Sequence, residues 1–267
     1  MDFTKQLVVV YNKKGIQTIE KAVTYVKPII ELDKKKESIL LAGDGQSNPD
    51  EYKQINSSTG LAVNYYMILN SLGKIEDLTF EDKVAKPLKC NGGLKANIDV
   101  SYKRDGKIIY VESKFLEPYY SKNEHLRESY FNKEYYDVPN EDKDAWYKLL
   151  KDAQEFKYYN VSQLCRHLMA IWRKHEKDKT PIVLQSVTWS MPDVFIEEME
   201  SAKDKEKYKK LKRIIDEEAI KCQSRIREFL IQIDWKNMAF EALHYNDMLE
   251  DISSSKYIEE FKRRYFL

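Results

Sequence analysis

Asp99, Glu112 and Lys114 are the residues of this chain whose types and spacing best suit chemistry on a phosphate. Like charges directly opposite one another destabilise a sheet, so a pair of facing carboxylates suits a site that holds a cation. Mg²⁺ takes oxygen ligands and commonly uses only one or two protein carboxylates. The ammonium group of Lys114 could stabilise negative charge that develops on a phosphate. Together these residue types indicate phosphodiester hydrolysis.

A tight turn is predicted between the two carboxylates, in the segment 97–117. Asp105-Gly106 lies between alternating apolar runs, which is a strong signal for a two-residue hairpin turn. Pairing outward from this turn places Asp99 opposite Glu112, with Cβ atoms roughly 4.5–5.5 Å apart. Lys114 follows two residues later and points to the same face. The alternative interpretation is an ordinary half-buried strand with one polar face. The other predicted pairs are Arg104 with Lys107, Lys103 with Ile108, and Ser101 with Tyr110.

The pattern Asp99…Glu112-Ser113-Lys114 resembles the catalytic signature of the PD-(D/E)XK nuclease superfamily. The longer segments 97–100 and 112–118 are similar to an uncharacterised restriction-endonuclease-like branch of that superfamily. The resemblance implies that Asp99, Glu112 and the carbonyl of Ser113 bind a metal, and that Lys114 is the catalytic lysine. It also implies Mg²⁺ as the cofactor, with Mn²⁺ as a substitute. Ile98 stands where the classical signature has a proline.

The rest of the chain predicts a layered α/β scaffold around this hairpin. The near-continuous apolar run over 181–189 is typical of a strand that is covered on both faces, which requires helices on each side. We therefore expect a three-layer α/β/α sandwich around a central mixed sheet, of the restriction-endonuclease-like type, with helical additions. Further strands are predicted near 80–84 and 240–245. One domain over 1–267 is expected, with a helical insertion at about 195–235 that serves as an arm for DNA or dimerisation, or as a solvated helix.

Two helices offer candidate contacts to nucleic acid. Ser57 or Ser58 is a natural N-cap for a helix that ends before Gly73, and its N-terminus could contact phosphate, although capping alone explains the serines. The helix after the Glu-x-Lys motif in the superfamily often carries a glutamine and basic residues that point to the site. Gln163, Arg166 and His167 resemble such a set, and phosphate contact is weighed against simple exposure. A metal role for His167 is not expected.

The segment 117–145 is rich in tyrosine and charge. Aromatic and basic residues that alternate in this way suit nucleic acid, through stacking and phosphate contacts. They equally suit an irregular segment that packs over an open sheet. Both interpretations stay open at this point.

Composition limits the choice of partner. The 267 residues include 45 basic and 44 acidic side chains, for a net charge of +1. A non-specific coat of nucleic acid is therefore not expected, and any contact must come from a local basic face.

The three cysteines are widely separated and form neither a disulfide framework nor a zinc pattern, and no signal or membrane-spanning segment is evident. A cytoplasmic protein is therefore expected. The leading hypothesis is a metal-dependent deoxyribonuclease that acts on double-stranded DNA, with a homodimer expected by analogy. The alternative is an inactive nucleic-acid-binding or assembly module with the same fold.

Overall fold

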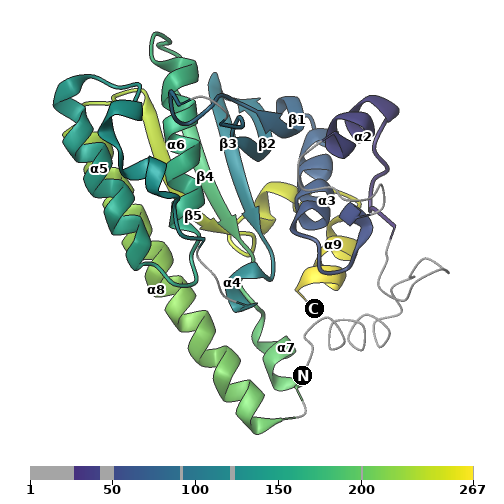
Figure 1. Ribbon diagram of the computed structural model, residues 1–267. Helices are drawn as coiled ribbons and strands as arrows, with labels where there is room; N and C mark the ends of the chain where they lie inside the picture. Colours follow the sequence, from purple (N-terminus) through teal and green to yellow (C-terminus); the bar gives the residue numbers. More distant parts are fainter. Residues whose placement is uncertain (1–26, 43–50, 91–92, 121–123, 200, 267) are drawn as a thin grey trace.

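A five-stranded mixed sheet forms the centre of the molecule (Figure 1). The computed structural model describes residues 27–42, 51–90, 93–120, 124–199 and 201–266. The strands follow one another in space in chain order, from β1 to β5. The first three are antiparallel neighbours, and β3, β4 and β5 run parallel. The bounds are β1 (Glu76–Lys83), β2 (Asn97–Arg104), β3 (Lys107–Lys114), β4 (Ile182–Thr188) and β5 (Met238–His244).

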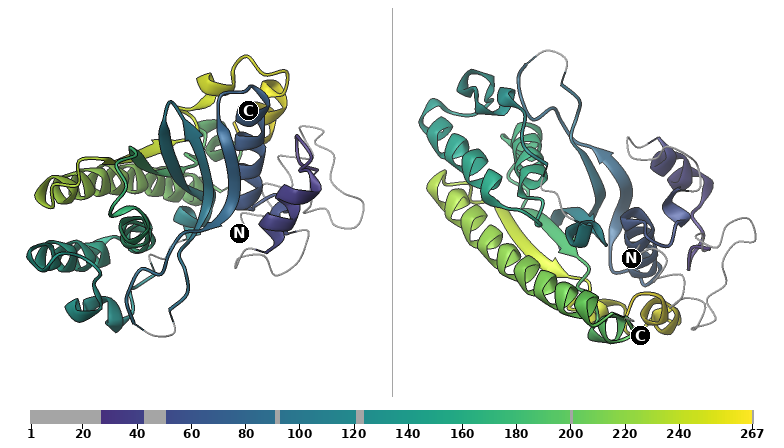
Figure 2. Two further views of the ribbon diagram at one scale, coloured as in Figure 1. Left: turned by 90° about the horizontal axis from the view of Figure 1, so that it is seen from above. Right: turned by 60° about the horizontal axis from the view of Figure 1, so that its bottom comes forward.

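Helices cover both faces of this sheet, which confirms the predicted three-layer architecture (Figure 2). The helices are α2 (Lys34–Leu41), α3 (Ser58–Ser71), α4 (Glu117–Tyr120), α5 (Lys143–Asp152), α6 (Val161–His175), α7 (Asp193–Glu197), α8 (Ala202–Gln232) and α9 (Ile258–Tyr265). Short 3₁₀ turns are η1 (Glu51–Lys53), η2 (Glu128–Phe131), η3 (Lys133–Tyr135), η4 (Asn140–Asp142), η5 (Ala153–Glu155) and η6 (Leu249–Ile252). In the sequence, Ile16, Ile19, Val23 and Val26 recur at helical spacing and predict a further helix, which lies outside the described residues.

The two helical layers can be assigned from side-chain contacts. The side chain of Tyr110 in β3 faces α6, where its hydroxyl lies 2.8 Å from His175 Nε2. On the other face, the ring of Tyr102 in β2 packs against Tyr66 of α3, with centroids 5.5 Å apart. The layer with α6 also contains α5 and α8, because Trp146 of α5 contacts both neighbours through its ring. The site described below lies between the sheet and α6.

The buried strand and the long helix follow from their sequences. Every residue of β4 is buried, as the apolar run predicts for a strand covered on both faces. The segment predicted as helical at about 195–235 forms α7 and the 31-residue α8. The stripe of Cys222, Ile226, Phe229 and Leu230 on α8 is buried, and α8 crosses the back of β5. None of the helices formed by described residues combines the length and apolar character needed to cross a bilayer.

Candidate active site

The hairpin turn sets the register of the site. Asp105 and Gly106 both have positive φ, at 51° and 72°, as a two-residue type I′ turn requires. The observed pairs include Arg104 with Lys107, Lys103 with Ile108 and Ser101 with Tyr110, as the turn predicts. Backbone pairing ends at Val100 and Val111, one residue before the predicted pair of Asp99 and Glu112.

The three predicted catalytic side chains lie on one face of the sheet. Glu112 and Lys114 follow Tyr110 at alternate positions of β3, and Tyr110 faces α6. Asp99 precedes Ser101, the partner of Tyr110, by two residues, so it belongs to the same face. The two carboxylates are close enough for the charge on Glu112 to perturb Asp99. The predicted juxtaposition of Asp99, Glu112 and Lys114 is therefore present.

Glu112 lies at the centre of the site and is only 1% exposed. Its Oε1 contacts Lys114 Nζ at 2.5 Å, and its Oε2 contacts His167 Nε2 at 2.6 Å. Burial alone would raise the pKa of Glu112, but Lys114 and His167 outweigh it and lower that pKa to about 2. The carboxylate is therefore ionised at neutral pH.

Asp99 has a different environment. Its Oδ2 accepts a hydrogen bond of 2.7 Å from the backbone N–H of Ser113. Burial and the negative charge of Glu112 nevertheless raise the pKa of Asp99 well above its ordinary value. Two negative charges are thus costly here unless a cation compensates for them. That balance suits a cation-binding site.

Lys114 is the protein's own cation beside the carboxylates of Asp99 and Glu112. Its pKa is raised: burial acts to lower it, but the carboxylates of Glu112 and Asp99 outweigh burial. The side chain is 18% exposed. Because the ammonium group holds its proton, Lys114 can stabilise negative charge and donate hydrogen bonds, but it is not a base at neutral pH.

The residues present fit a hard divalent cation. Asp99 and Glu112 offer carboxylate oxygens, and the Ser113 side chain points away because its Oγ lies 2.7 Å from Tyr245 Oη on the other face. The donor that the resemblance implies at Ser113 is accordingly its carbonyl. Within the described ranges, no group of three or more His, Cys, Asp or Glu side chains is arranged to hold a metal. Such a donor set is compatible with Mg²⁺, which commonly binds one or two carboxylates and water.

Glu81 is a third acidic residue near the site. The sequence allows two placements for it, close to the metal site or, as the favoured interpretation, on the surface. In the structure it is 7% exposed and accepts a hydrogen bond from Asn97 Nδ2. Its charge helps to raise the pKa of Asp99. Glu81 has a positive φ of 54°, and the register of β1 against β2 places it opposite Asp99.

His167 is where the sequence-based expectation needs correction. Of the two alternatives, simple exposure is wrong, because the side chain is 3% exposed and bonds to Glu112. Phosphate contact by His167 stays a prediction. The sequence does not show the burial because α6 is covered around most of its circumference, and His167 is among its buried polar residues. His167 therefore supports a site carboxylate instead of facing solvent.

Gln163 and Arg166 do lie at the site entrance. Gln163 Oε1 accepts a hydrogen bond of 2.8 Å from Asn160 Nδ2, and Arg166 Nη2 lies 3.3 Å from Glu124 Oε2. Both remain predicted nucleic-acid contacts. Ser57 caps α3, with its Oγ accepting from the Gly60 N–H at 3.0 Å.

Ser57 and Ser58 belong to the opposite helical layer. They begin α3, which packs on the face of the sheet away from Glu112, and they line neither of the two cavities described here. The structure thus gives Ser57 a capping role and does not bring either serine to Asp99, Glu112 or Lys114. Phosphate contact by them stays a prediction.

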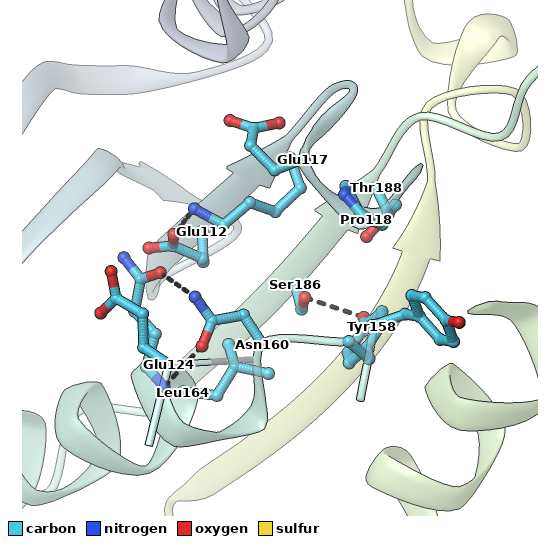
Figure 3. Close-up of a pocket in the computed structure, with 12 residues that line it drawn as sticks. Glu112, Glu117, Pro118, Glu124, Tyr158, Asn160, Leu164, Ser186 and Thr188 are labelled. Atoms are coloured by element: carbon cyan, nitrogen blue, oxygen red, sulfur yellow. Dashed lines mark hydrogen bonds and ion pairs between the residues drawn. The ribbon is translucent and has the colours of Figure 1, made fainter. Parts of the chain in front are cut away.

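A cavity of about 210 Å³ opens directly beside Glu112 and Lys114 (Figure 3). Glu112 and Lys114 lie on the strand side, and Asn160 and Leu164 lie at the start of α6. Glu124, an exposed carboxylate, lies beside Asn160 at the rim. The cavity gives a small polar substrate group access to the buried carboxylate and lysine.

The mixed five-stranded sheet, its two helical layers and the acid–lysine site define a protein with a restriction-endonuclease-like core. Comparison with family models agrees with this class. The model described as "Restriction Endonuclease associating with ARP" matches residues 31–266, and the chain belongs to that family. Comparisons with curated proteins and with solved structures found no match. Family membership indicates a nuclease-like function.

Proposed function

We propose that this protein is a Mg²⁺-dependent endodeoxyribonuclease that hydrolyses phosphodiester bonds in double-stranded DNA, with Mn²⁺ as a substitute metal. One observation carries the proposal: Asp99, Glu112 and Lys114 converge on one face of the sheet beside an open cavity. Membership of a restriction-endonuclease family supports a nuclease-like chemistry for these residues.

Each residue has a role that follows from its environment. Asp99 and Glu112 would hold the metal, together with the carbonyl of Ser113. When bound, Mg²⁺ would supply Lewis-acid stabilisation of the negative charge on the phosphate. Lys114, which keeps its proton, stabilises the charge that develops on the non-bridging oxygens in the transition state. His167 holds Glu112 in place from α6.

Plasmid cleavage tests the proposal. Supercoiled DNA is incubated with the protein in Mg²⁺, in Mn²⁺ and in EDTA. We expect cleavage in both metals and none in EDTA. Lys114→Ala and Asp99→Asn should each lower the cleavage rate by at least about 100-fold, since each removes a charge that acts on the transition state or its metal.

Matched controls lie on the same hairpin. Lys107→Ala removes an exposed lysine at the start of β3, and Asp105→Asn changes the turn, where asparagine also tolerates positive φ. Both should retain full activity and the same thermal unfolding as the original protein. DNA binding without cleavage in every metal would instead support an inactive binding or assembly module, and equal activity in Lys114→Ala would refute the assigned site.

A further inference from the structure

A second and larger cavity adjoins the site. It measures about 780 Å³ and is lined by described residues of the ranges 86–97 and 124–135 and by α6. We call it the basic groove and define it by Lys86, Lys95, Arg127, Tyr130 and Arg166. It shares Glu124 and Gln163 with the smaller cavity, and His167 lines its inner end. The groove therefore leads from the protein surface to the catalytic carboxylate.

The groove is strongly cationic although the whole chain is nearly neutral. Four cationic side chains line it, against the single carboxylate of Glu124, while the chain as a whole carries a net charge of +1. Lys86, Lys95 and Arg127 are exposed. Among the described residues, none of these three has a carboxylate within ion-pair distance. A local excess of unpaired cations is the kind of surface that a polyanion neutralises.

Tyr130 lines the groove together with the two arginines, Arg127 and Arg166. Arg127 and Arg166 are both near enough to its hydroxyl to oppose the rise in pKa that burial of Tyr130 causes. The net effect is a raised pKa, so the hydroxyl stays a neutral hydrogen-bond donor. Two guanidinium groups and a hydroxyl make a donor set that matches phosphate oxygens.

Glu124 occupies the junction of the two cavities. Its carboxylate lies 3.3 Å from Arg166 Nη2, and its side chain is 69% exposed. An exposed ion pair of this kind contributes little stability, so an incoming phosphate can replace the carboxylate at low cost. Among the described residues that line the groove, Glu124 is the one that would repel a polyanion.

We propose that the basic groove binds the sugar–phosphate backbone of the DNA strand next to the scissile bond, with Arg166 as its contact nearest the site. This inference rests on the proposed nuclease function, because it takes DNA as the substrate. The inference adds to that function the direction in which the DNA strand leaves the site, toward Lys86 and Lys95. The residues involved come from three segments that are remote in the sequence.

Binding without cleavage tests the proposal separately from catalysis. A fluorescently labelled DNA duplex is titrated with the protein in EDTA, and the dissociation constant is measured by anisotropy at several salt concentrations. Each phosphate contact contributes about 0.9 to the slope of log affinity against log salt. Lys86→Ala, Lys95→Ala and Arg127→Ala should each reduce that slope by about 1 and weaken binding at low salt. The triple variant should reduce it by about 3.

Two further variants make the test specific. Glu124→Gln should tighten binding, because it removes the only carboxylate among the described groove residues. Lys236→Ala removes an exposed cation that lies two residues before β5, where it is paired with Asp234 at 3.2 Å. It lies at the opposite strand end from Lys114 and should leave the slope unchanged.

The outcomes separate the two proposals. An unchanged slope in the triple variant, or an equal loss in Lys236→Ala, would overturn the groove assignment even if plasmid cleavage is observed. A reduced slope with intact folding, checked by thermal unfolding, supports the groove whether or not cleavage is seen. If the triple variant does not fold, the exposed single variants Lys86→Ala and Lys95→Ala decide by the same measurement.

Discussion

At the scale of single residues, the site depends on how Glu112 is held. The carboxylate is ionised and buried, and its two oxygens contact different elements: Lys114 on its own strand and His167 on α6. Because the carboxylate accepts, His167 Nε2 must be the donor in this hydrogen bond. His167 is thus a positioning residue for a predicted metal ligand. Such partners commonly tune ligand orientation and metal affinity.

Removing the His167 side chain should weaken Mg²⁺-dependent cleavage more than it affects the fold. We expect His167→Ala to lower the cleavage rate about 10- to 100-fold and to raise the Mg²⁺ concentration needed for half-maximal rate. His167→Gln should restore part of both losses, since an amide can donate to Glu112. Cleavage rates over a Mg²⁺ series provide the measurement. A lower rate with an unchanged Mg²⁺ midpoint would contradict the positioning role and indicate a general packing defect.

At the scale of elements, the hairpin could be predicted because its determinants are local. Asp105-Gly106 fixes the turn, the turn fixes the register, and alternation then places Glu112 and Lys114 on one face. The contributions of Glu81 and His167 could not be predicted in the same way. Glu81 depends on the register of β1 against β2, which no short turn fixes, and His167 depends on how α6 packs against a strand far away in sequence.

The start of α3 depends on a close backbone approach. A Cβ atom added at Gly60 would overlap the carbonyl oxygen of Tyr52, and backbone cannot move aside as a flexible side chain can. We expect Gly60→Ala to reduce the free energy of unfolding by about 1–3 kcal/mol. Urea unfolding of the variant and of the original protein measures this difference in the free energy of unfolding. Gly93→Ala is the matched control, because no atom of the described residues lies within 4 Å of the added Cβ, and it should not lower stability. Equal stability of the two variants would contradict the steric explanation.

The contact between α6 and β3 should make stability depend on pH. His175 lies between Tyr110 Oη at 2.8 Å and Asp178 Oδ2 at 3.2 Å. Burial lowers the pKa of His175 below its ordinary value of 6.5, although Asp178 partly opposes this. The unfolded chain therefore takes up a proton at higher pH than the folded chain. The stabilising effect is complete above pH 6.5 and is lost as pH falls through the folded pKa.

Urea unfolding at several values between pH 7.5 and pH 5 tests this dependence. The free energy of unfolding should fall with pH over that window in the original protein, and His175→Gln should show a flatter profile. His125→Gln, at an exposed imidazole, is the control for the substitution itself and should keep the original profile. A profile for His175→Gln as steep as the original would exclude His175 as the source.

At the scale of the whole molecule, α8 links the last strand of the sheet, β5, to the rim of the site. The helix packs along β5, where Gln223 Oε1 accepts from the N–H of Ala242 at 2.8 Å. Its Glu218 carboxylate also accepts hydrogen bonds from three successive backbone N–H groups, those of Lys157, Tyr158 and Tyr159, at 2.8–3.0 Å. Tyr158 and Tyr159 line the cavity beside Glu112. A residue remote from the site in sequence thus fixes one wall of the cavity.

Removing the Glu218 carboxylate should therefore lower both stability and activity. Glu218→Ala leaves three N–H groups without their acceptor, and we expect a loss of about 1–3 kcal/mol in the free energy of unfolding. Cleavage should fall as well, because the wall formed by Tyr158 and Tyr159 loses its anchor. Glu217→Ala is the matched control, since that neighbouring carboxylate is 68% exposed and contacts only Arg213 among the described residues, at 3.6 Å. Urea unfolding and plasmid cleavage on the two variants would separate the effects. A loss of stability in Glu218→Ala with full cleavage activity would show that the wall keeps its shape without α8.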